Sequence, residues 1–182
     1  AEVPLNVIPA AAKATRVSGV RAKATELGGV QPVGTIHAGQ DFSVESQTPV
    51  VTAARLRTAG TDYPAAIRTR YLQLPESTPA RVGEFTSNLT SDAATPYQKA
   101  VTIRDWLETN KQYSLSVRKP RGNIADAFIF QMERGYCVYF ATTMVAMLRT
   151  QGIPARFVVG YTPGQRVSQD EWVVRGLDSH AW

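Results

Sequence analysis

The segment that follows Gly135 restricts the fold more than any other, because it puts an amphipathic helix directly before a strand. Apolar residues recur with the 3.6-residue period of a helix over residues 137–151. Gly152 is well placed to end this helix, and Pro154 prevents it from continuing. A buried strand is predicted at residues 155–161, and further strands are predicted at residues 172–177 and 179–182.

Upstream of this segment, from Tyr63 onward, the pattern is helical. Thr78-Pro79 and Thr95-Pro96 each combine a capping residue with proline at the first helical position, so a helix is predicted after each pair. Asn123 is placed to cap a third, short helix that runs to Phe130.

The amino-terminal part of the chain reads as a small β-rich region. Residues 20–25 alternate apolar and polar side chains, and Gly28-Gly29 follows as a turn signal. Further strands are predicted at residues 41–45 and 50–57. The pattern therefore divides the chain into a β-rich region of unknown role, residues 1–62, and a second domain, residues 63–182.

The 182 residues include one cysteine and two histidines, which excludes two common ways of stabilising a small domain. A lone cysteine forms no intrachain disulfide, and one cysteine with two histidines supplies too few ligands for a structural zinc site. Stability must come from packing, for which 43% hydrophobic residues provide enough material. No metal and no cofactor is predicted.

A net charge of +5 does not by itself indicate nucleic-acid binding. The densest basic stretch, Arg118, Lys119 and Arg121, is typical of an ordinary solvated turn. The sequence has no helix-turn-helix, RNA-recognition or zinc-knuckle pattern, and no glycine-rich phosphate-binding motif. Neither a nucleic-acid partner nor nucleotide hydrolysis is expected.

No apolar run approaches the ~18 residues that are needed to span a bilayer, and no charged leader precedes an apolar stretch at the start. The chain begins with Ala1 rather than Met and stops at Trp182, within a predicted strand. We expect it to be a processed form or a piece of a longer protein.

Two interpretations are open for Cys137, which lies in the first turn of the predicted helix. Unpaired N–H groups and the positive end of the helix dipole stabilise a thiolate there and can donate to an oxyanion. A free cysteine is also a common small core residue. His180 is the natural partner, because an imidazole beside the sulfur can take its proton and later give it to a leaving amine. His37, which has no motif nearby, is interpreted as a surface or structural residue.

An ordered series of motifs favours the catalytic interpretation. The series resembles the core of the transglutaminase-like superfamily over about residues 97–182. The resemblance is greatest to bacterial membrane-anchored proteins whose soluble transglutaminase-like domain is extracytoplasmic. Its elements are G-Y-C-V-Y-F-A-T (135–142), M-L-R (147–149), G-I-P-A-R (152–156), V-G-Y (159–161) and D-S-H-A-W (178–182).

The resemblance implies an α+β, papain-like fold in which the cysteine helix packs against an antiparallel sheet. Residue by residue, Cys137 matches the nucleophile and His180 the general base. Tyr113, in a Y-x-L element, is expected near the cleft without an assigned role. The family's third catalytic residue is an Asp on the strand after H-A-W, so the domain is expected to be truncated and its sheet incomplete. For Asp178, within the D-x-H-A-W motif, a structural role is favoured over an orienting one.

The resemblance implies a cysteine enzyme that transfers acyl groups from peptide or carboxamide substrates. Hydrolysis would make it a protease or amidase, and aminolysis a cross-linker. Without the Asp this chain is expected to be weakly active or inactive, since losing the acid of a comparable triad costs on the order of 10⁴ in turnover. The alternative is a non-catalytic protein-binding or assembly module that keeps the fold.

The resemblance also bears on where the protein works and what it contacts. The parent protein is expected to be membrane-anchored and to hold this domain on the extracytoplasmic side. Its predicted partner is a protein or peptide substrate, and an exposed edge strand can promote self-association.

Overall fold

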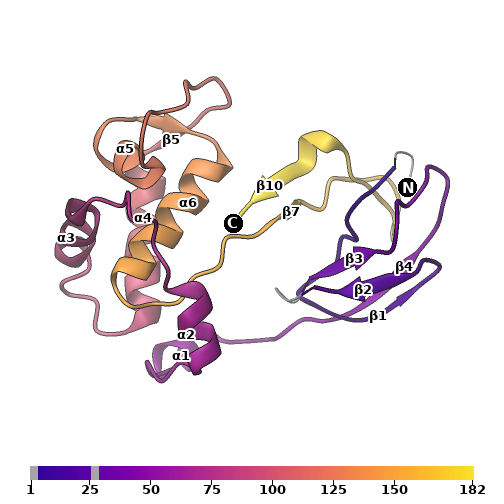
Figure 1. Cartoon of the computed structure of the whole chain (residues 1–182), viewed down its shortest axis with the longest axis horizontal. Helices are drawn as coiled ribbons and strands as arrows, with labels where there is room; N and C mark the ends of the chain where they lie inside the picture. Colours follow the sequence, from indigo (N-terminus) through magenta and orange to yellow (C-terminus); the bar gives the residue numbers. More distant parts are fainter. Residues whose placement is uncertain (1–3, 26–28) are drawn as a thin grey trace. The chain divides into compact units, whose positions relative to one another are not determined.

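The computed structural model describes residues 4–25 and 29–182. Its backbone separates into two compact units, Ala1–Val51 and Thr52–Trp182, which are coloured from indigo to yellow along the chain in Figure 1. The sequence pattern puts the boundary after residue 62. The short helix α1 (Ala53–Arg57) lies between these two boundaries and belongs to the second unit.

The first unit consists of two antiparallel strand pairs in its described part. Strand β1 pairs with β4, and the register shifts between Ala14 and Arg16. Strand β2 pairs with β3, while Leu5 and Ile36 form an isolated bridge and the Ile36 side chain is buried. The strands are β1 (Lys13–Ser18), β2 (Ala22–Ala24), β3 (Val30–Pro32) and β4 (Ser43–Gln47).

The predicted strands at 20–25 and 41–45 are confirmed as β2 and β4, although β4 begins and ends two residues later than predicted. The predicted strand at 50–57 is wrong, because Ala53–Arg57 is helical. Thr52 caps this helix by accepting a hydrogen bond from the Arg55 N–H at 3.3 Å, and Ala, Arg and Leu favour helix. The Gly28 half of the predicted turn lies outside the described residues, while Gly29 N–H donates to Thr25 Oγ1 at 2.9 Å.

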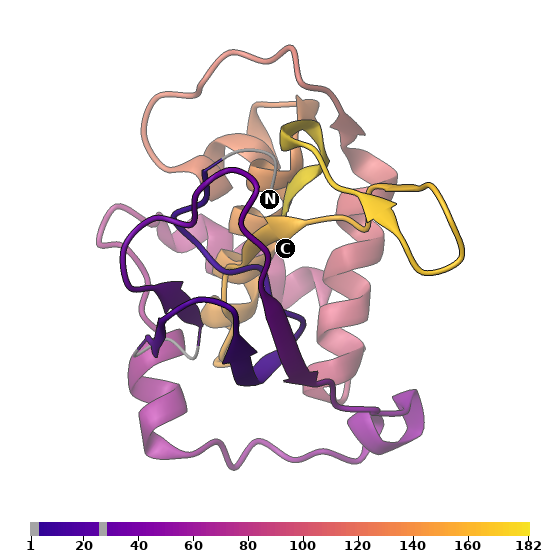
Figure 2. The same ribbon diagram turned by 90° about the vertical axis from the view of Figure 1, so that its right-hand side faces the viewer.

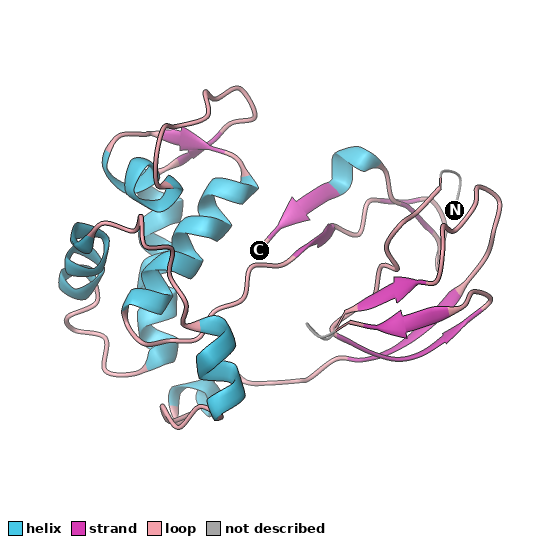
Figure 3. Cartoon of the chain, in the orientation of Figure 1, coloured by secondary structure: helices cyan, strands magenta, loops and turns pink. Residues whose placement is uncertain are grey.

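Helices dominate the first part of the second unit, and short strands dominate its last part (Figure 3). The helices are α1, α2 (Ala65–Tyr71), α3 (Ala80–Leu89), α4 (Pro96–Asn110), α5 (Ile124–Phe130) and α6 (Cys137–Thr150), with a 3₁₀ turn at Gly176–Asp178. The strands are β5 (Gln112–Tyr113), β6 (Arg134–Gly135), β7 (Val159–Tyr161), β8 (Gln165–Arg166), β9 (Trp172–Val173) and β10 (Ser179–Ala181).

The helix signals that were identified in the sequence are confirmed at α4, α5 and α6. Thr95 Oγ1 accepts from the Gln98 N–H at 3.2 Å, and Asn123 Oδ1 accepts from the Asp126 N–H at 3.1 Å. Gly152 follows α6 with φ of 71°, a left-handed conformation that glycine adopts without strain.

Helix α6 is the centre of the second unit, since it contacts α3, α4, α5 and strand β10. The buried core lies between these helices, and the cysteine helix starts from it. Its buried members are Val82, Ile103, Leu107, Phe128, Ile129, Tyr139, Met147 and Leu148. Among the described residues, no helix is long and apolar enough to cross a membrane.

Strands β7 and β10 form an antiparallel pair in which His180 lies opposite Gly160. The α+β class and the packing of the cysteine helix on an antiparallel sheet are therefore confirmed. The predicted buried strand at 155–161 is wrong in two respects: only Val159–Tyr161 is strand, and Val159 is 70% exposed. The predicted strand at 172–177 shortens to β9, which pairs with β8 in a hairpin that Figure 2 shows in yellow.

Candidate active site

Cys137 is the first residue of α6 and is half-buried. The backbone of Tyr136 is extended, and its carbonyl accepts from the Tyr139 N–H at 2.8 Å and from the Phe140 N–H at 3.4 Å. The N–H groups of Cys137 and Val138 precede these first helical hydrogen bonds. The thiol therefore lies where the helix dipole favours a negative charge.

The strand pair β5–β6 fixes the point at which α6 begins. Tyr113 lies opposite Gly135 in this parallel pair, and the Ser114 N–H donates to the Gly135 carbonyl at 2.8 Å. A Cβ atom on Gly135 would lie 2.7 Å from Cε2 of Phe128 and 2.8 Å from Cβ of Tyr139. The close approach that seats the start of α6 on the core thus requires glycine.

Lys111 holds the turn that connects α5 to β6. Its ammonium donates to the carbonyls of Ile129 at 3.0 Å and Met132 at 2.7 Å. The same group lies 5.4 Å from the ring centroid of Trp106 and 5.5 Å from that of Phe128. Burial lowers the pKa of Lys111 below its ordinary value. The side chain satisfies carbonyls that the end of α5 leaves without a helical partner.

Tyr113 lies beside the cysteine. Its ring stacks on Phe140, with centroids 6.2 Å apart, while 56% of the residue stays exposed. Desolvation is the main cause that raises the pKa of Tyr113. A hydrogen bond from the backbone of Cys137 opposes this shift, whereas the charge of the thiol and its hydrogen bond with the phenol add to it. Tyr113 and Cys137 are therefore neighbours whose charges influence each other.

His180 lies on β10, which contacts α6, so the predicted base is on an element that packs against the cysteine helix. Its ring is 5.0 Å from the ring of Trp182, at an interplanar angle of 63°. A Cβ on Gly160, opposite His180, would lie 3.3 Å from Cζ3 of Trp182. In the described part of the chain no hydrogen bond or ion pair joins His180 to Cys137.

Asp178 ends the 3₁₀ turn that precedes β10. Its carboxylate accepts from the Arg175 N–H at 2.7 Å, and its carbonyl accepts from the Thr162 N–H at 2.9 Å. The side chain therefore closes a turn of its own backbone, and the carbonyl ties that turn to the end of β7.

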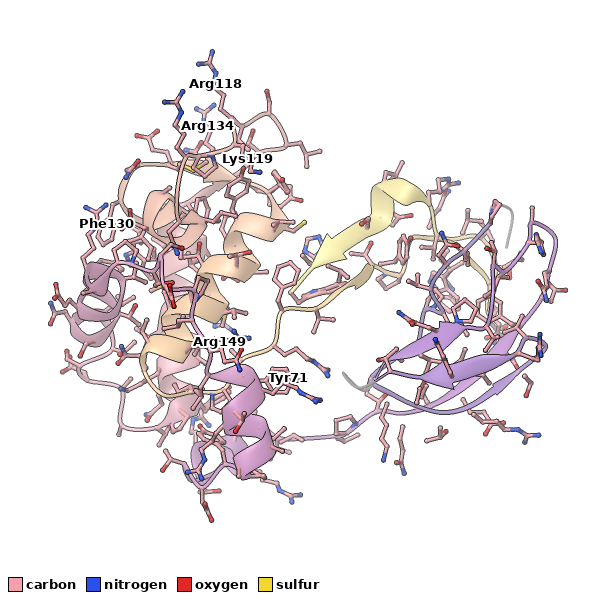
Figure 4. All side chains as sticks on the ribbon, viewed as in Figure 1. Tyr71, Arg118, Lys119, Phe130, Arg134 and Arg149 are labelled. Carbon is pink, nitrogen blue, oxygen red and sulfur yellow. The ribbon has the colours of Figure 1, made fainter. Side chains whose placement is uncertain are left out.

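One residue that positions the site was not identified from the sequence. Arg149 donates through Nε and Nη2 to the Ala155 carbonyl, at 3.0 and 2.6 Å, and through Nη1 to the Gln73 carbonyl at 2.6 Å. Figure 4 shows it beside Tyr71, whose carbonyl accepts from the Ala155 N–H at 3.1 Å. Burial lowers the pKa of Arg149. This clamp holds the segment that leads from α6 to β7, and its only sequence signal is the M-L-R motif.

Within residues 4–25 and 29–182, His, Cys, Asp and Glu side chains form no group of three or more that could bind a metal ion. His37 lies exposed in the first unit. The two predicted site residues that the structure brings into contact are Tyr113 and Cys137.

Comparison with known proteins places this arrangement in a family. Residues 83–182 match the sequence model of the transglutaminase-like superfamily. The chain belongs to this superfamily. The match begins within α3 and includes Tyr113, the cysteine helix and β10.

Two known proteins are similar over larger parts of the chain. The chain is 34% identical to the uncharacterized protein YebA of Bacillus subtilis (strain 168) in an alignment of 122 positions that covers 62% of this chain and 17% of YebA. It is 29% identical to a protein-glutamine gamma-glutamyltransferase of Pseudomonas aeruginosa in an alignment of 153 positions that covers 78% of this chain and 23% of that protein. The chain therefore spans less than a quarter of the length of either relative.

The crystal structure of the periplasmic domain of TgpA from Pseudomonas aeruginosa has the same fold. It superposes with a TM-score of 0.75 at 24% sequence identity, and the match covers 99% of this chain and 61% of that one. The likeness extends over nearly all of this transglutaminase-like chain and supports the fold.

Proposed function

We propose that this chain carries a thiol-dependent acyl-transfer site, with Cys137 as nucleophile and His180 as general base. The observation that carries the proposal is the position of Cys137 at the start of α6, in contact with Tyr113 and on a helix that packs against the strand of His180. Membership of the transglutaminase-like superfamily supports the same class of chemistry.

The reaction follows from these groups. His180 takes the proton of Cys137, and the thiolate attacks the carbon of a carboxamide or peptide carbonyl, which gives a tetrahedral oxyanion. The oxyanion collapses to a thioester as His180 returns the proton to the departing ammonia or amine. Water or a second amine then attacks the thioester, His180 accepts its proton, and the thiol is regenerated. The free N–H groups at the start of α6 are placed to donate to the oxyanion.

Tyr113 is proposed as a positioning residue in this scheme. Its phenol is electrostatically coupled to Cys137, while the stack on Phe140 fixes its ring. This contact holds the thiol in one orientation before substrate arrives.

Asp178 is assigned a structural role, because its carboxylate is engaged by the Arg175 N–H. The family resemblance puts the orienting acid on a strand after H-A-W. We therefore expect the 182-residue chain to modify its thiol readily but to turn over slowly.

The preferred acyl donor is a glutamine carboxamide, and the preferred outcome is transfer to an amine. The similarity to a protein-glutamine gamma-glutamyltransferase supports this choice over hydrolysis. The likeness to a periplasmic domain supports an extracytoplasmic location, within a larger and membrane-anchored parent. Strand β7, on which Val159 and Tyr161 are exposed, provides an edge at which copies can associate.

The test is the mass of a glutamine-containing peptide after incubation with the chain, with and without a primary amine. Transfer adds the mass of the amine less that of ammonia, and hydrolysis adds about one mass unit by converting the carboxamide to an acid. Cys137→Ala and His180→Ala should abolish both products, while Ser179→Ala, on the same strand as His180, should not. Product formation that survives in Cys137→Ala would refute the proposal.

The second candidate is a non-catalytic binding or assembly module, which is favoured by the engagement of the Asp178 carboxylate in its own turn. If Cys137→Ala in the full-length parent leaves the cellular phenotype unchanged, this second function is the better one.

A further inference from the structure

The basic residues before α6 lie on, or directly after, the strand pair that precedes the nucleophile. Arg134 belongs to β6, which pairs with β5 so that the next residue, Gly135, lies opposite Tyr113. The loop that carries Arg118, Lys119 and Arg121 leaves the Tyr113–Gly135 end of this pair, directly after β5. We call these four residues the basic rim.

Both views of the ribbon show the 114–123 loop extending from one end of the helices (Figures 1 and 2). Arg118, Lys119 and Arg134 reach outward at that same end in Figure 4. All four residues of the basic rim are exposed. The loop begins directly after Tyr113, so it starts beside the strand pair from which the chain enters α6.

The basic rim is not neutralised by the chain around it. From residue 111 to residue 137 there are five basic and two acidic residues. Of the two acids, Asp126 is bound by Arg81 through two hydrogen bonds of 2.6 and 2.7 Å. The charge of Glu133 acts on Lys111, the fifth basic residue. None of the ion pairs in the described residues includes a member of the rim.

Two exposed apolar side chains accompany the cations. Leu115 is 78% exposed and Tyr113 is 56% exposed, and both lie at the start of the 114–123 loop. An extended peptide that presents acidic and apolar side chains matches this combination. A peptide is favoured over a lipid surface because an acyl donor must reach Cys137, which lies three residues after Arg134.

We propose that the basic rim binds an acidic segment next to the reactive residue of a polypeptide substrate. This proposal rests on the proposed function and adds the substrate class: glutamine donors flanked by Asp or Glu are preferred. Long-range attraction of such a segment raises the rate of encounter, and contact with the rim slows its release.

Binding is tested without catalysis. The full 182-residue chain with Cys137→Ala is titrated with two short fluorescent peptides that share a central glutamine, one flanked by Glu and the other by Lys. The acidic peptide should bind more tightly, and its affinity should fall as the salt concentration rises to about 0.3 M. Equal affinity for the two peptides would overturn the proposal.

Charge reversal locates the binding surface. Arg118→Glu with Arg134→Glu should weaken binding of the acidic peptide by roughly fivefold to tenfold, since each exposed contact contributes modestly. The matched control, Arg55→Glu with Arg68→Glu, makes the same change of net charge on the exposed faces of α1 and α2 and should have little effect. Equal losses in both double variants would show a non-specific charge effect and refute the rim.

Two further measurements separate the possible failures. Vesicles of phosphatidylcholine with phosphatidylserine test a membrane surface: binding to them that depends on Arg118 and Arg134, without a preference for the acidic peptide, refutes the peptide proposal. Preference for the acidic peptide, together with alkylation of Cys137 by iodoacetamide no faster than that of a model thiol, would instead retain the rim and reject the proposed function.

Discussion

Two parts of the second unit carry the proposed catalytic pair, and they are built differently. Cys137 begins a helix that contacts three other helices, and the residue before its cap, Gly135, is buried against two aromatic side chains. His180 lies on a three-residue strand whose partner contains Val159, which is 70% exposed. The nucleophile is thus held by the core, whereas the base is held by one strand pair and the ring of Trp182.

Because of this difference, the same kind of substitution should change the free energy of unfolding more near Cys137 than near His180. Near Cys137 the interior is close-packed, so added or removed atoms must shift neighbours. On the strand side many side chains face solvent, and small changes there should leave the free energy of unfolding within about 0.5 kcal/mol.

The largest effect on stability is expected from a glycine substitution in front of α6. Gly135→Ala should lower the free energy of unfolding by about 1–3 kcal/mol or more, because its Cβ would overlap Phe128 and Tyr139. It should also slow alkylation of Cys137 by iodoacetamide, since the start of α6 must move. Gly176→Ala, in the 3₁₀ turn before β10, meets nothing within 4 Å and serves as the control. Thermal unfolding and the alkylation rate are measured for both variants. Equal effects of the two substitutions would contradict the difference in packing between the surroundings of Cys137 and those of His180.

An intermediate effect is expected from the ion pair between α3 and α5. The Arg81 guanidinium hydrogen-bonds to Asp126 and holds the pKa of that carboxyl below its usual range. Its stabilisation is therefore fully present above the unfolded pKa, about 4, and is lost as the pH falls through the lower folded pKa.

Asp126→Asn should lower the free energy of unfolding at neutral pH. It should also remove the part of the loss of stability at low pH that is caused by protonation of Asp126. Urea unfolding from pH 7 down to pH 2 measures both. The exposed pair Arg104–Asp105 provides the control, Asp105→Asn. A curve for Asp126→Asn that stays parallel to that of the unmodified chain would show that the pair does not set the acid limit.

The smallest effect on stability is expected from removal of the Tyr113 hydroxyl. Tyr161, on strand β7, offers a matched phenol as the control. Tyr113→Phe keeps the stack on Phe140 and should change the free energy of unfolding by less than about 1 kcal/mol. The dependence of the iodoacetamide rate on pH should nevertheless change, because the phenol no longer meets the Cys137 sulfur. Tyr161→Phe on β7 is the control; an unaltered pH profile in Tyr113→Phe would deny Tyr113 a positioning role.

Local signals predicted the helical part well. Thr95 and Asn123 cap helices through hydrogen bonds to residues three positions away, so a short stretch of sequence contains both partners of each bond. The periodicity of residues 137–151 likewise reflects one helix packed on a core. The position of Cys137 at a helix start followed from the same kind of information.

Contacts between distant residues were not predictable in this way. The parallel pairing that brings Tyr113 opposite Gly135 joins two strands of two residues each, too short to leave a period in the sequence. Lys111 reads as an ordinary charged residue at the end of α4, and only the fold places carbonyls of Ile129 and Met132 around its ammonium. The sequence alone predicts an ordinary solvated turn at Arg118, Lys119 and Arg121, because Arg134, the fourth residue of the basic rim, is distant from these three in sequence.

The half-buried ammonium of Lys111 has a practical consequence for labelling. Its lowered pKa favours the unprotonated form that acylating reagents attack, but the nitrogen is committed to two carbonyls in front of two aromatic rings, and this loss of access should dominate. Of the five lysines in the chain, it should acquire a tag last while the domain is folded. Mass mapping of Lys111 would then report whether the turn in front of the thiol has opened, in a sample whose substrate is still unknown.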